Sequence, residues 1–166
     1  MSKQLTSRTE QDIQEWVKKF PKEHKRSAIL MALRLAQKQK QWLNDDLLDE
    51  VAKLLDVPPI WVYEVAGFYS MYERQPVGKH KIAVCNSISC VLSGADSVLC
   101  DLKKRLNIEV GETTNDQRIT LQETECLGAC CDAPAVMLNE TEYLYKPTAT
   151  SILERINELD KQGAES

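Results

Sequence analysis

The sequence lacks the segments that would carry it into or across a membrane. No stretch approaches about 18 consecutive apolar residues, the length that a spanning helix needs. The first residues, Met1 to Thr6, contain neither an apolar core nor a small-residue cleavage site, so they do not resemble a secretory signal. We therefore expect a cytoplasmic protein without a membrane span.

Nucleotide-binding and hydrolytic motifs are also missing. The chain contains neither G-x-G-x-x-G nor G-x-x-x-x-G-K-[ST], the glycine-rich patterns that hold phosphates. Its two histidines, His24 and His80, have no metal-binding neighbour at helical spacing, so we expect ordinary surface histidines. The net charge of -4 argues against nucleic acid as the main partner. No Ser/His/Asp set indicates hydrolysis, and no C-x-x-C pair indicates dithiol exchange.

Cysteine, by contrast, is plentiful and confined to one half of the chain. Residues 1–78 carry 12 Lys and Arg against 11 Asp and Glu, whereas residues 79–166 carry 9 against 14. All six cysteines lie in this second, acidic half. Structural disulfides are rare in the cytoplasm, so cysteines there more often hold metal or do redox chemistry. The asymmetry indicates two domains with separate roles.

Apolar periodicity predicts an α+β protein, with a small helical bundle in residues 1–75 and an α/β domain in residues 76–166. Four short helices are expected within residues 7–20, 27–41, 44–55 and 59–72, the first capped by Ser7. The second domain reads β-α-β-β-β-α, with strands at 80–85, 119–123, 135–138 and 143–145. Trp61 and Phe68 are expected in the core of the bundle, whereas Tyr69 and Tyr72 suit either core or interface.

Four cysteines in two close pairs predict a metal centre. Cys85 and Cys90 form C-x4-C, with Cys85 at the end of a strand and Cys90 in the loop beyond. Cys126 and Cys130 form C-x3-C around Gly128, which can adopt backbone angles that other residues avoid. A [2Fe–2S] cluster takes two sulfurs on each iron, and a structural zinc ion takes four cysteines from two such pairs. The spacing alone leaves both metals open.

The two remaining cysteines complicate the choice of ligands. Cys131 directly follows Cys130, and because adjacent side chains point apart, only one of the two should reach the metal. Cys100 lies beside apolar residues in a predicted helix, so we expect a buried core thiol there.

The two cysteine segments, with the following Asp132-Ala-Pro-Ala-Val-Met137, resemble the cluster motif of the thioredoxin-like [2Fe–2S] ferredoxins. Val65-Ala-Gly-Phe-Tyr-Ser-Met-Tyr72 and Arg74-Gln-Pro-Val-Gly78 resemble other parts of the same family, and the likeness covers nearly the whole chain from about Ala28. Cys131 departs from the family pattern. The resemblance implies a thioredoxin-like domain whose [2Fe–2S] cluster is held by Cys85, Cys90, Cys126 and Cys130.

Within this family, the likeness is to the small cluster-bearing subunits of NADH:quinone oxidoreductase, respiratory complex I. It implies an electron-transfer subunit without a complete active site, whose cluster exchanges single electrons with FMN. The FMN and NAD sites would lie on a partner flavoprotein subunit, against which the helical domain docks. The resemblance implies a place on the cytoplasmic side of the membrane, held peripherally through other subunits. The alternatives are the equivalent subunit of an NAD-linked hydrogenase or formate dehydrogenase, or a zinc adaptor without redox activity.

Overall fold

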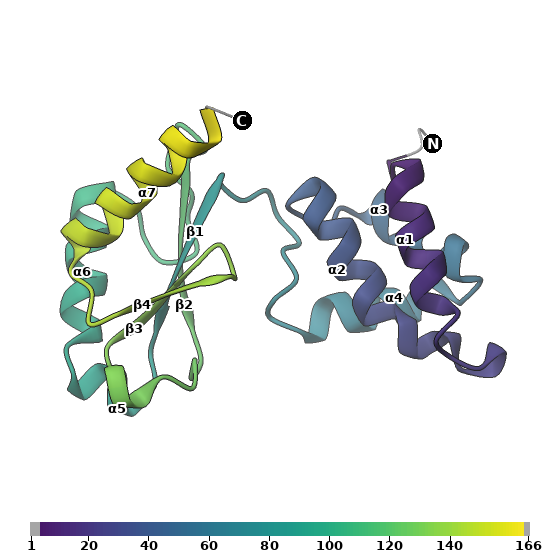
Figure 1. The fold of residues 1–166 in the computed structure, drawn as a ribbon, viewed down its shortest axis with the longest axis horizontal. Coiled ribbons are helices and arrows are strands. Elements are labelled where there is room, and N and C mark those ends of the chain that lie inside the picture. Colours follow the sequence, from purple (N-terminus) through teal and green to yellow (C-terminus); the bar gives the residue numbers. More distant parts are fainter. Residues whose placement is uncertain (1–3, 165–166) are drawn as a thin grey trace. The chain divides into compact units, whose positions relative to one another are not determined.

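The computed structural model describes residues 4–164 and divides the chain into two compact units, Met1–Pro76 and Val77–Ser166. Figure 1 shows helices alone in the first unit and a sheet with helices in the second. The α+β class expected from the sequence is confirmed, since helical and mixed segments follow one another along the chain.

The first unit is a helical bundle built around one apolar core. Its elements are α1 (Ser7–Val17), the 3-10 segment η1 (Lys22–Ala28), α2 (Ile29–Lys40), α3 (Asp45–Leu55) and α4 (Pro59–Phe68). Asn44 caps α3 by accepting a hydrogen bond from the Leu47 amide at 2.8 Å. The cap of α1 is Thr6 rather than Ser7, because the Thr6 hydroxyl accepts from the Thr9 amide and Ser7 already lies within the helix. The largest fully buried side chains of this core are Ile13, Ile29, Leu33, Leu43, Leu47, Leu48 and Leu55.

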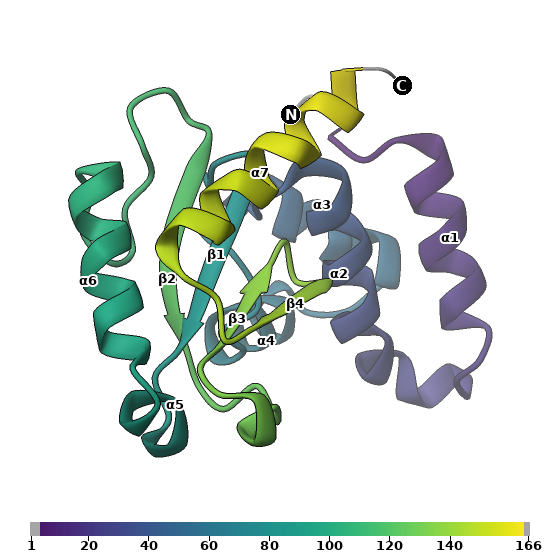
Figure 2. The ribbon, with the colours of Figure 1, turned by 60° about the vertical axis from the view of Figure 1, so that its left-hand side comes forward.

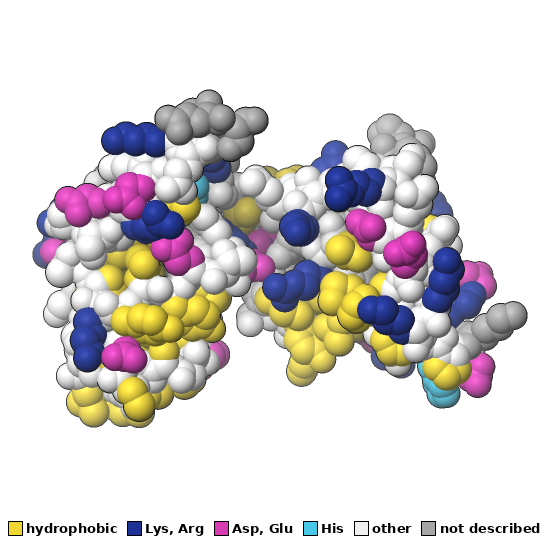
Figure 3. All heavy atoms as spheres, viewed as in Figure 1, with side chains coloured by type: hydrophobic (Ala, Val, Ile, Leu, Met, Phe, Trp, Pro, Cys, Tyr) yellow, Lys and Arg dark blue, Asp and Glu magenta, His cyan; other side chains and the backbone are white. Residues whose placement is uncertain are grey.

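Helix α4 is apolar on more than one side, and one side faces solvent. Val62 and Ala66 are buried, but Phe68 is 80% exposed and Ile60 is 61% exposed. The expectation that Phe68 lies in the core was therefore wrong. Tyr72, in contrast, is buried, and its hydroxyl donates to the Leu30 carbonyl oxygen at 2.7 Å. Apolar side chains crowd part of the surface of the helical unit in Figure 3.

The second unit is a four-stranded mixed sheet with helices. Its elements are β1 (His80–Cys85), α5 (Ile88–Leu92), α6 (Ala95–Leu106), β2 (Ile119–Thr124), η2 (Cys130–Asp132), β3 (Ala135–Leu138), β4 (Glu142–Tyr145) and α7 (Ala149–Ala164). The strand order is β2-β1-β3-β4, with β1 and β2 parallel and the other pairs antiparallel. A parallel pair needs a crossover, which α5 and α6 supply (Figure 2).

One face of this sheet packs on α6 and α7, which contact each other. Their buried side chains meet the alternate, inward residues of the strands. The main members of this core are Ile82, Val84, Leu121, Val136, Leu138, Leu102, Ile152 and Ile156. On the opposite face of β4, Tyr143 and Tyr145 stack with ring centroids 6.2 Å apart and are 41% and 55% exposed.

A cluster of polar side chains links α7 to the start of β1. His80 is buried, not a surface residue as expected, and its Nε2 lies 3.0 Å from Asp160 Oδ1. Asn139 Nδ2 contacts the other ring nitrogen at 3.1 Å. Arg118 Nε donates to Asp160 Oδ2 at 2.7 Å. Hydrogen bonds from Lys79, His80 and Arg118 hold the pKa of the Asp160 carboxyl well below its ordinary value.

Candidate metal centre

The parallel pairing of β1 and β2 brings the two cysteine segments to one edge of the sheet. Cys85 is the last residue of β1 and is paired in register with Thr124, the last residue of β2. The Asn86 amide donates to the Thr124 carbonyl oxygen at 2.9 Å, so the strands stay together to their ends. Cys126 follows only two residues later. Because carboxyl ends of parallel strands meet at the same edge, the first thiol of each pair lies at that edge.

Cys90 lies in the short helix α5 rather than in a loop, which corrects the sequence-based expectation. The Cys90 amide donates to the Ser87 carbonyl oxygen at 2.9 Å and so closes the first turn of this helix. The turn folds the chain back, so that Cys85 and Cys90 interact through their side chains. Both thiols are buried, at 1% and 2% exposure.

The second pair is held by a tight turn around Gly128. The sulfur of Cys126 lies 3.9 Å from the sulfur of Cys130. Gly128 has φ +74°, in the left-handed region that glycine favours, and its amide donates to Cys126 Sγ at 3.4 Å. Cys126 and Cys130 are both exposed, so the site has one buried pair of thiols and one pair near solvent.

Backbone amides surround the buried sulfurs. Burial acts to raise the pKa of the Cys85 thiol, but amides of Ser87 and Leu127 donate to it and leave that pKa lowered. Leu127 belongs to the other cysteine loop, so this hydrogen bond ties the two segments together. Burial raises the pKa of Cys90, against the opposing effect of the Ala135 amide. These donors favour sulfur in its negative, metal-binding form.

Interactions among the thiols also shift the pKa values of Cys90 and Cys130. The hydrogen bond and the negative charge of Cys126 raise the pKa of the Cys130 thiol, and the charge of Cys85 adds to this effect. Cys85 and Cys130 likewise raise the pKa of Cys90. Like charges this close are costly unless a cationic centre lies between them. Four soft sulfur donors with this mutual influence suit a thiolate-bound metal centre.

The arrangement in pairs fits a two-iron cluster. Within residues 4–164, no three His, Cys, Asp or Glu side chains are grouped as a site for a single metal ion. A [2Fe–2S] cluster does not need such a group, because each iron takes only two protein sulfurs. Cys85 with Cys90, and Cys126 with Cys130, provide two such pairs. Four thiols in two pairs therefore match the donor set of a [2Fe–2S] cluster.

The other two cysteines lie apart from these contacts. Cys131 is exposed and follows Cys130, whose sulfur makes the contact with Cys126. Cys100 is also exposed, so the expectation of a buried core thiol was wrong. On α6 the buried residues are Ala95 and Leu102, and a helix turns about 100° per residue, which places Cys100 about 160° from Leu102.

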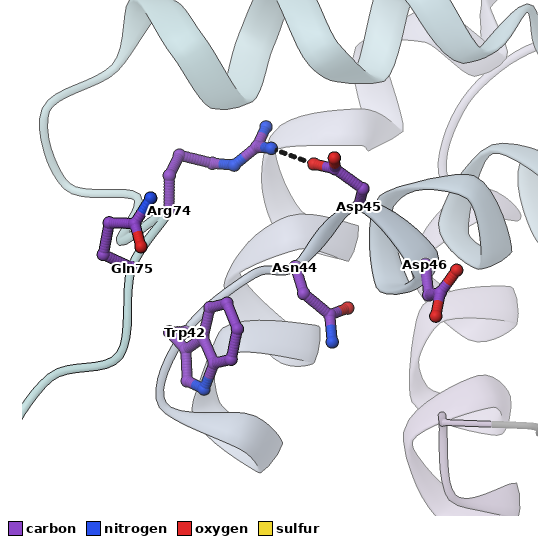
Figure 4. A pocket seen from close by; sticks show the side chains of 6 residues that line it. All are labelled: Trp42, Asn44, Asp45, Asp46, Arg74 and Gln75. Atoms are coloured by element: carbon purple, nitrogen blue, oxygen red, sulfur yellow. Dashed lines mark hydrogen bonds and ion pairs between the residues drawn. The ribbon is translucent and has the colours of Figure 1, made fainter.

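A hollow in the helical unit is a weaker candidate for a functional site than the cysteine site. Its volume is about 520 Å³, and its lining is formed by Trp42, Asn44, Asp45, Asp46, Arg74 and Gln75. Figure 4 shows the Arg74 guanidinium directed at the Asp45 carboxylate, with which it forms an ion pair. Asp46, the remaining charged residue of the lining, carries a carboxylate that would repel a phosphate. The hollow is therefore a poor nucleotide site.

Across residues 4–164, none of the helices combines the length and the apolar character that crossing a bilayer requires.

Comparison with known proteins shows which family the chain resembles. The model of the thioredoxin-like [2Fe–2S] ferredoxin family matches residues 13–160. The chain is 47% identical over 128 residues to the E subunit of the NADH-quinone oxidoreductase of Rickettsia prowazekii (strain Madrid E), covering 76% of this chain and 72% of that protein. It is 38% identical over 141 residues to the mitochondrial NADH dehydrogenase [ubiquinone] flavoprotein 2 of Dictyostelium discoideum, covering 84% and 57%.

A solved structure shares the fold. The crystal structure of an NAD+-reducing [NiFe]-hydrogenase in the air-oxidized state superposes with a TM-score of 0.68 at 24% identity. The match covers 81% of this chain and 23% of the hydrogenase chain. The family match spans both the helical unit and the cysteine-bearing sheet. The chain belongs to the thioredoxin-like [2Fe–2S] ferredoxin family.

Proposed function

We propose that this protein is the electron-transfer subunit of an NADH:quinone oxidoreductase, a respiratory complex I. The observation that carries the proposal is the meeting of two thiol pairs at the ends of β1 and β2, with Cys126 and Cys130 sulfurs 3.9 Å apart. The similarity to the NADH-quinone oxidoreductase protein of Rickettsia prowazekii supports the choice of complex. The chain contributes to an oxidoreductase without holding a complete active site.

Cys85, Cys90, Cys126 and Cys130 would hold one [2Fe–2S] cluster, with the first two thiols on one iron and the last two on the other. When bound, the cluster supplies one-electron exchange with FMN. The protein fixes the sulfurs through the β1–β2 register and shields the first pair from solvent. Its backbone amides at Ser87, Leu127, Gly128 and Ala135 donate to three of the four sulfurs. Burial and these donors together set how readily the site accepts negative charge.

The FMN and NAD sites belong, in this proposal, to a flavoprotein subunit. This assignment agrees with the lack of glycine-rich phosphate-binding motifs in the sequence and with the acidic hollow of the helical unit. The protein would lie on the cytoplasmic side of the membrane, held peripherally by other subunits.

The helical unit provides a surface suited to docking. Ile60, Phe68, Tyr69 and Met71 are exposed apolar side chains on or just after α4, and Phe68 packs edge-on against Tyr69 at 5.0 Å between centroids. Aromatic residues and methionine are enriched at protein interfaces. Phe68→Ala should therefore weaken co-purification with the flavoprotein subunit, while Val110→Ala, an exposed apolar site in the other unit, should not. Equal recovery of the complex with both variants would contradict this docking role.

The visible spectrum of the full chain, purified without oxygen, tests the function. We expect a brown protein with sulfur-to-iron charge-transfer bands that bleach on addition of dithionite, and about equal amounts of iron and inorganic sulfide. A colourless protein with one tightly bound zinc ion would refute the redox role and favour a structural adaptor.

A further inference from the structure

The second thiol pair is accessible from solvent, and its two sulfurs lie close enough to react with each other. Cys126 Sγ and Cys130 Sγ are 3.9 Å apart. Both residues are exposed, whereas Cys85 and Cys90 are buried. A disulfide needs its sulfurs at about 2.0 Å, so rotations about the side-chain bonds have to bring this pair about 2 Å closer. The exposed pair is therefore a candidate for a cross-link within one loop.

The backbone of this loop keeps the two cysteines together. Cys126 follows β2, and Cys130 begins η2, where the Asp132 amide donates to the Ala129 carbonyl oxygen at 3.1 Å. Between the cysteines, Gly128 turns the chain with φ +74°, and its amide donates to Cys126 Sγ at 3.4 Å. The turn thus holds both sulfurs on one short segment whose ends are fixed by regular structure.

The other thiols do not combine closeness with exposure in this way. Cys85 and Cys90 are 1% and 2% exposed, so a bulky disulfide reagent cannot reach their sulfurs. Cys131 is exposed, but the sulfur that contacts Cys126 is that of Cys130. Cys100 is exposed on a different element, α6. The structure therefore selects one pair among the six cysteines.

We propose that Cys126 and Cys130 form a reversible disulfide when a chain that carries no cluster meets glutathione disulfide, and that this modification blocks cluster loading. The inference rests on the ligand assignment of the proposed function. One cysteine sulfur attacks glutathione disulfide, which forms a mixed disulfide and releases one glutathione thiol. The other cysteine sulfur then attacks the mixed disulfide and releases the second glutathione thiol. The cysteines lose two electrons and two protons, and glutathione disulfide gains them.

The disulfide removes two of the four proposed ligands, because metals bind the thiolate form of cysteine. It also closes a loop of only five residues, residues 126–130, and a short loop gains little stability from a cross-link. Glutathione thiol can therefore reverse the reaction by the same two steps. In a loaded chain both sulfurs are engaged, so the modification concerns chains that await their cluster.

Mass spectrometry after alkylation tests this inference. The full chain is treated with a chelator under reducing conditions, freed of reductant and exposed to glutathione disulfide without oxygen. We expect two of the six thiols to be lost to alkylation. The tryptic peptide 119–155, which contains Cys126, Cys130 and Cys131, should be lighter by two hydrogen atoms and alkylated only at Cys131. Iron and sulfide should produce charge-transfer bands in the reduced chain, and in the oxidised chain only after dithiothreitol is added.

Variants of single cysteines provide the controls. Cys131→Ser and Cys100→Ser should still lose two thiols, whereas Cys130→Ser should stop at a mixed disulfide between Cys126 and glutathione. A disulfide that includes Cys131, or six thiols that remain open to alkylation, would overturn the inference. Equal rates of loading in the oxidised and reduced chains would overturn its blocking role. Unchanged protein that never binds a cluster would refute the ligand assignment instead, while the alkylation pattern still decides whether the disulfide forms.

Discussion

Gly78 lies close to the backbone at the start of β2, and replacing it tests how the cysteine-bearing sheet is held together. Gly78 is buried just before β1. A Cβ atom at this position would lie 2.8 Å from the Ile119 backbone nitrogen and 2.9 Å from the Arg118 carbonyl carbon. The Gly78 amide also donates to the Thr120 hydroxyl at 2.7 Å, in a buried environment. Gly78→Ala must therefore push the start of β1 away from β2.

The size of the effect follows from three contributions. Forcing a methyl group into packed backbone costs about 1–3 kcal/mol. Stretching or losing the buried amide hydrogen bond costs about 1 kcal/mol. Alanine restricts the unfolded chain more than glycine does, which stabilises the folded variant by about 0.4–1 kcal/mol. We expect a net destabilisation of the second unit by about 2 kcal/mol, taking central values of these contributions.

Hydrogen exchange followed by mass spectrometry measures this change in one unit at a time. A loss of about 2 kcal/mol lowers the protection of the slowest amides in β1 and β2 by about 30-fold, provided that exchange reports the opening equilibrium. Amides of α2 and α3, in the other unit, serve as an internal reference. Gly67→Ala is the control variant, because a Cβ there meets nothing within 4 Å and alanine favours the exposed end of α4. Unchanged protection of β1 and β2 in Gly78→Ala would refute this account of the sheet.

Three further predictions concern the site and the charged groups. Cys130→Ser should abolish or distort the visible spectrum of the cluster, whereas Cys131→Ser and Cys100→Ser should keep it; a normal spectrum in Cys130→Ser would disprove the ligand assignment. Burial raises the pKa of Tyr72 to about 12, so its contribution to stability is complete below pH 10 and is lost as the pH rises towards 12. By linkage this amounts to about 2–3 kcal/mol in the helical unit, and alkaline unfolding of Tyr72→Phe should lack that pH dependence. Asp160 has a lowered pKa, so the stability it provides is present at neutral pH and is lost as the pH falls below about 4, the ordinary value for Asp. In acid unfolding followed by circular dichroism, Asp160→Asn should be less stable at pH 7 but should lose less stability on acidification; an equal loss in both proteins would contradict this role.

Much of the fold could be predicted because local patterns agreed with it. Alternation of apolar residues located all four strands to within a residue or two, and the helices predicted at 44–55 and 59–72 begin within a residue of α3 and α4. The position of Cys85 at a strand end and the special backbone of Gly128 also followed from the sequence. These features depend on contacts between near neighbours in the chain, which a sequence displays directly.

The errors have separate physical causes, which are a helix too short to show a period, a misjudged helix face, a side chain left exposed and burial by distant segments. Cys90 lies in a helix of five residues, too short for an apolar period to reveal. The burial of Cys100 was predicted from its apolar neighbours along the chain. Residues three or four apart share a helix face and adjacent residues do not, so the prediction failed. Phe68 continues an apolar run, but the described part of the helical unit does not cover its side chain. The buried ring of His80 contacts Asp160 and Asn139, which lie far away in the sequence.

The parallel pairing of β1 and β2 has a consequence for how the protein matures. Local helix contacts in α1 to α4 can form as soon as that segment leaves the ribosome, because N-terminal units fold first during synthesis. The β1–β2 pair must wait for the crossover through α6, and non-local pairings of this kind form slowly. Cys126 approaches Cys85 only when this pairing is complete. Loading of iron and sulfide should therefore be a late step in biogenesis, and newly made chains should present a folded helical unit before they can accept the cluster.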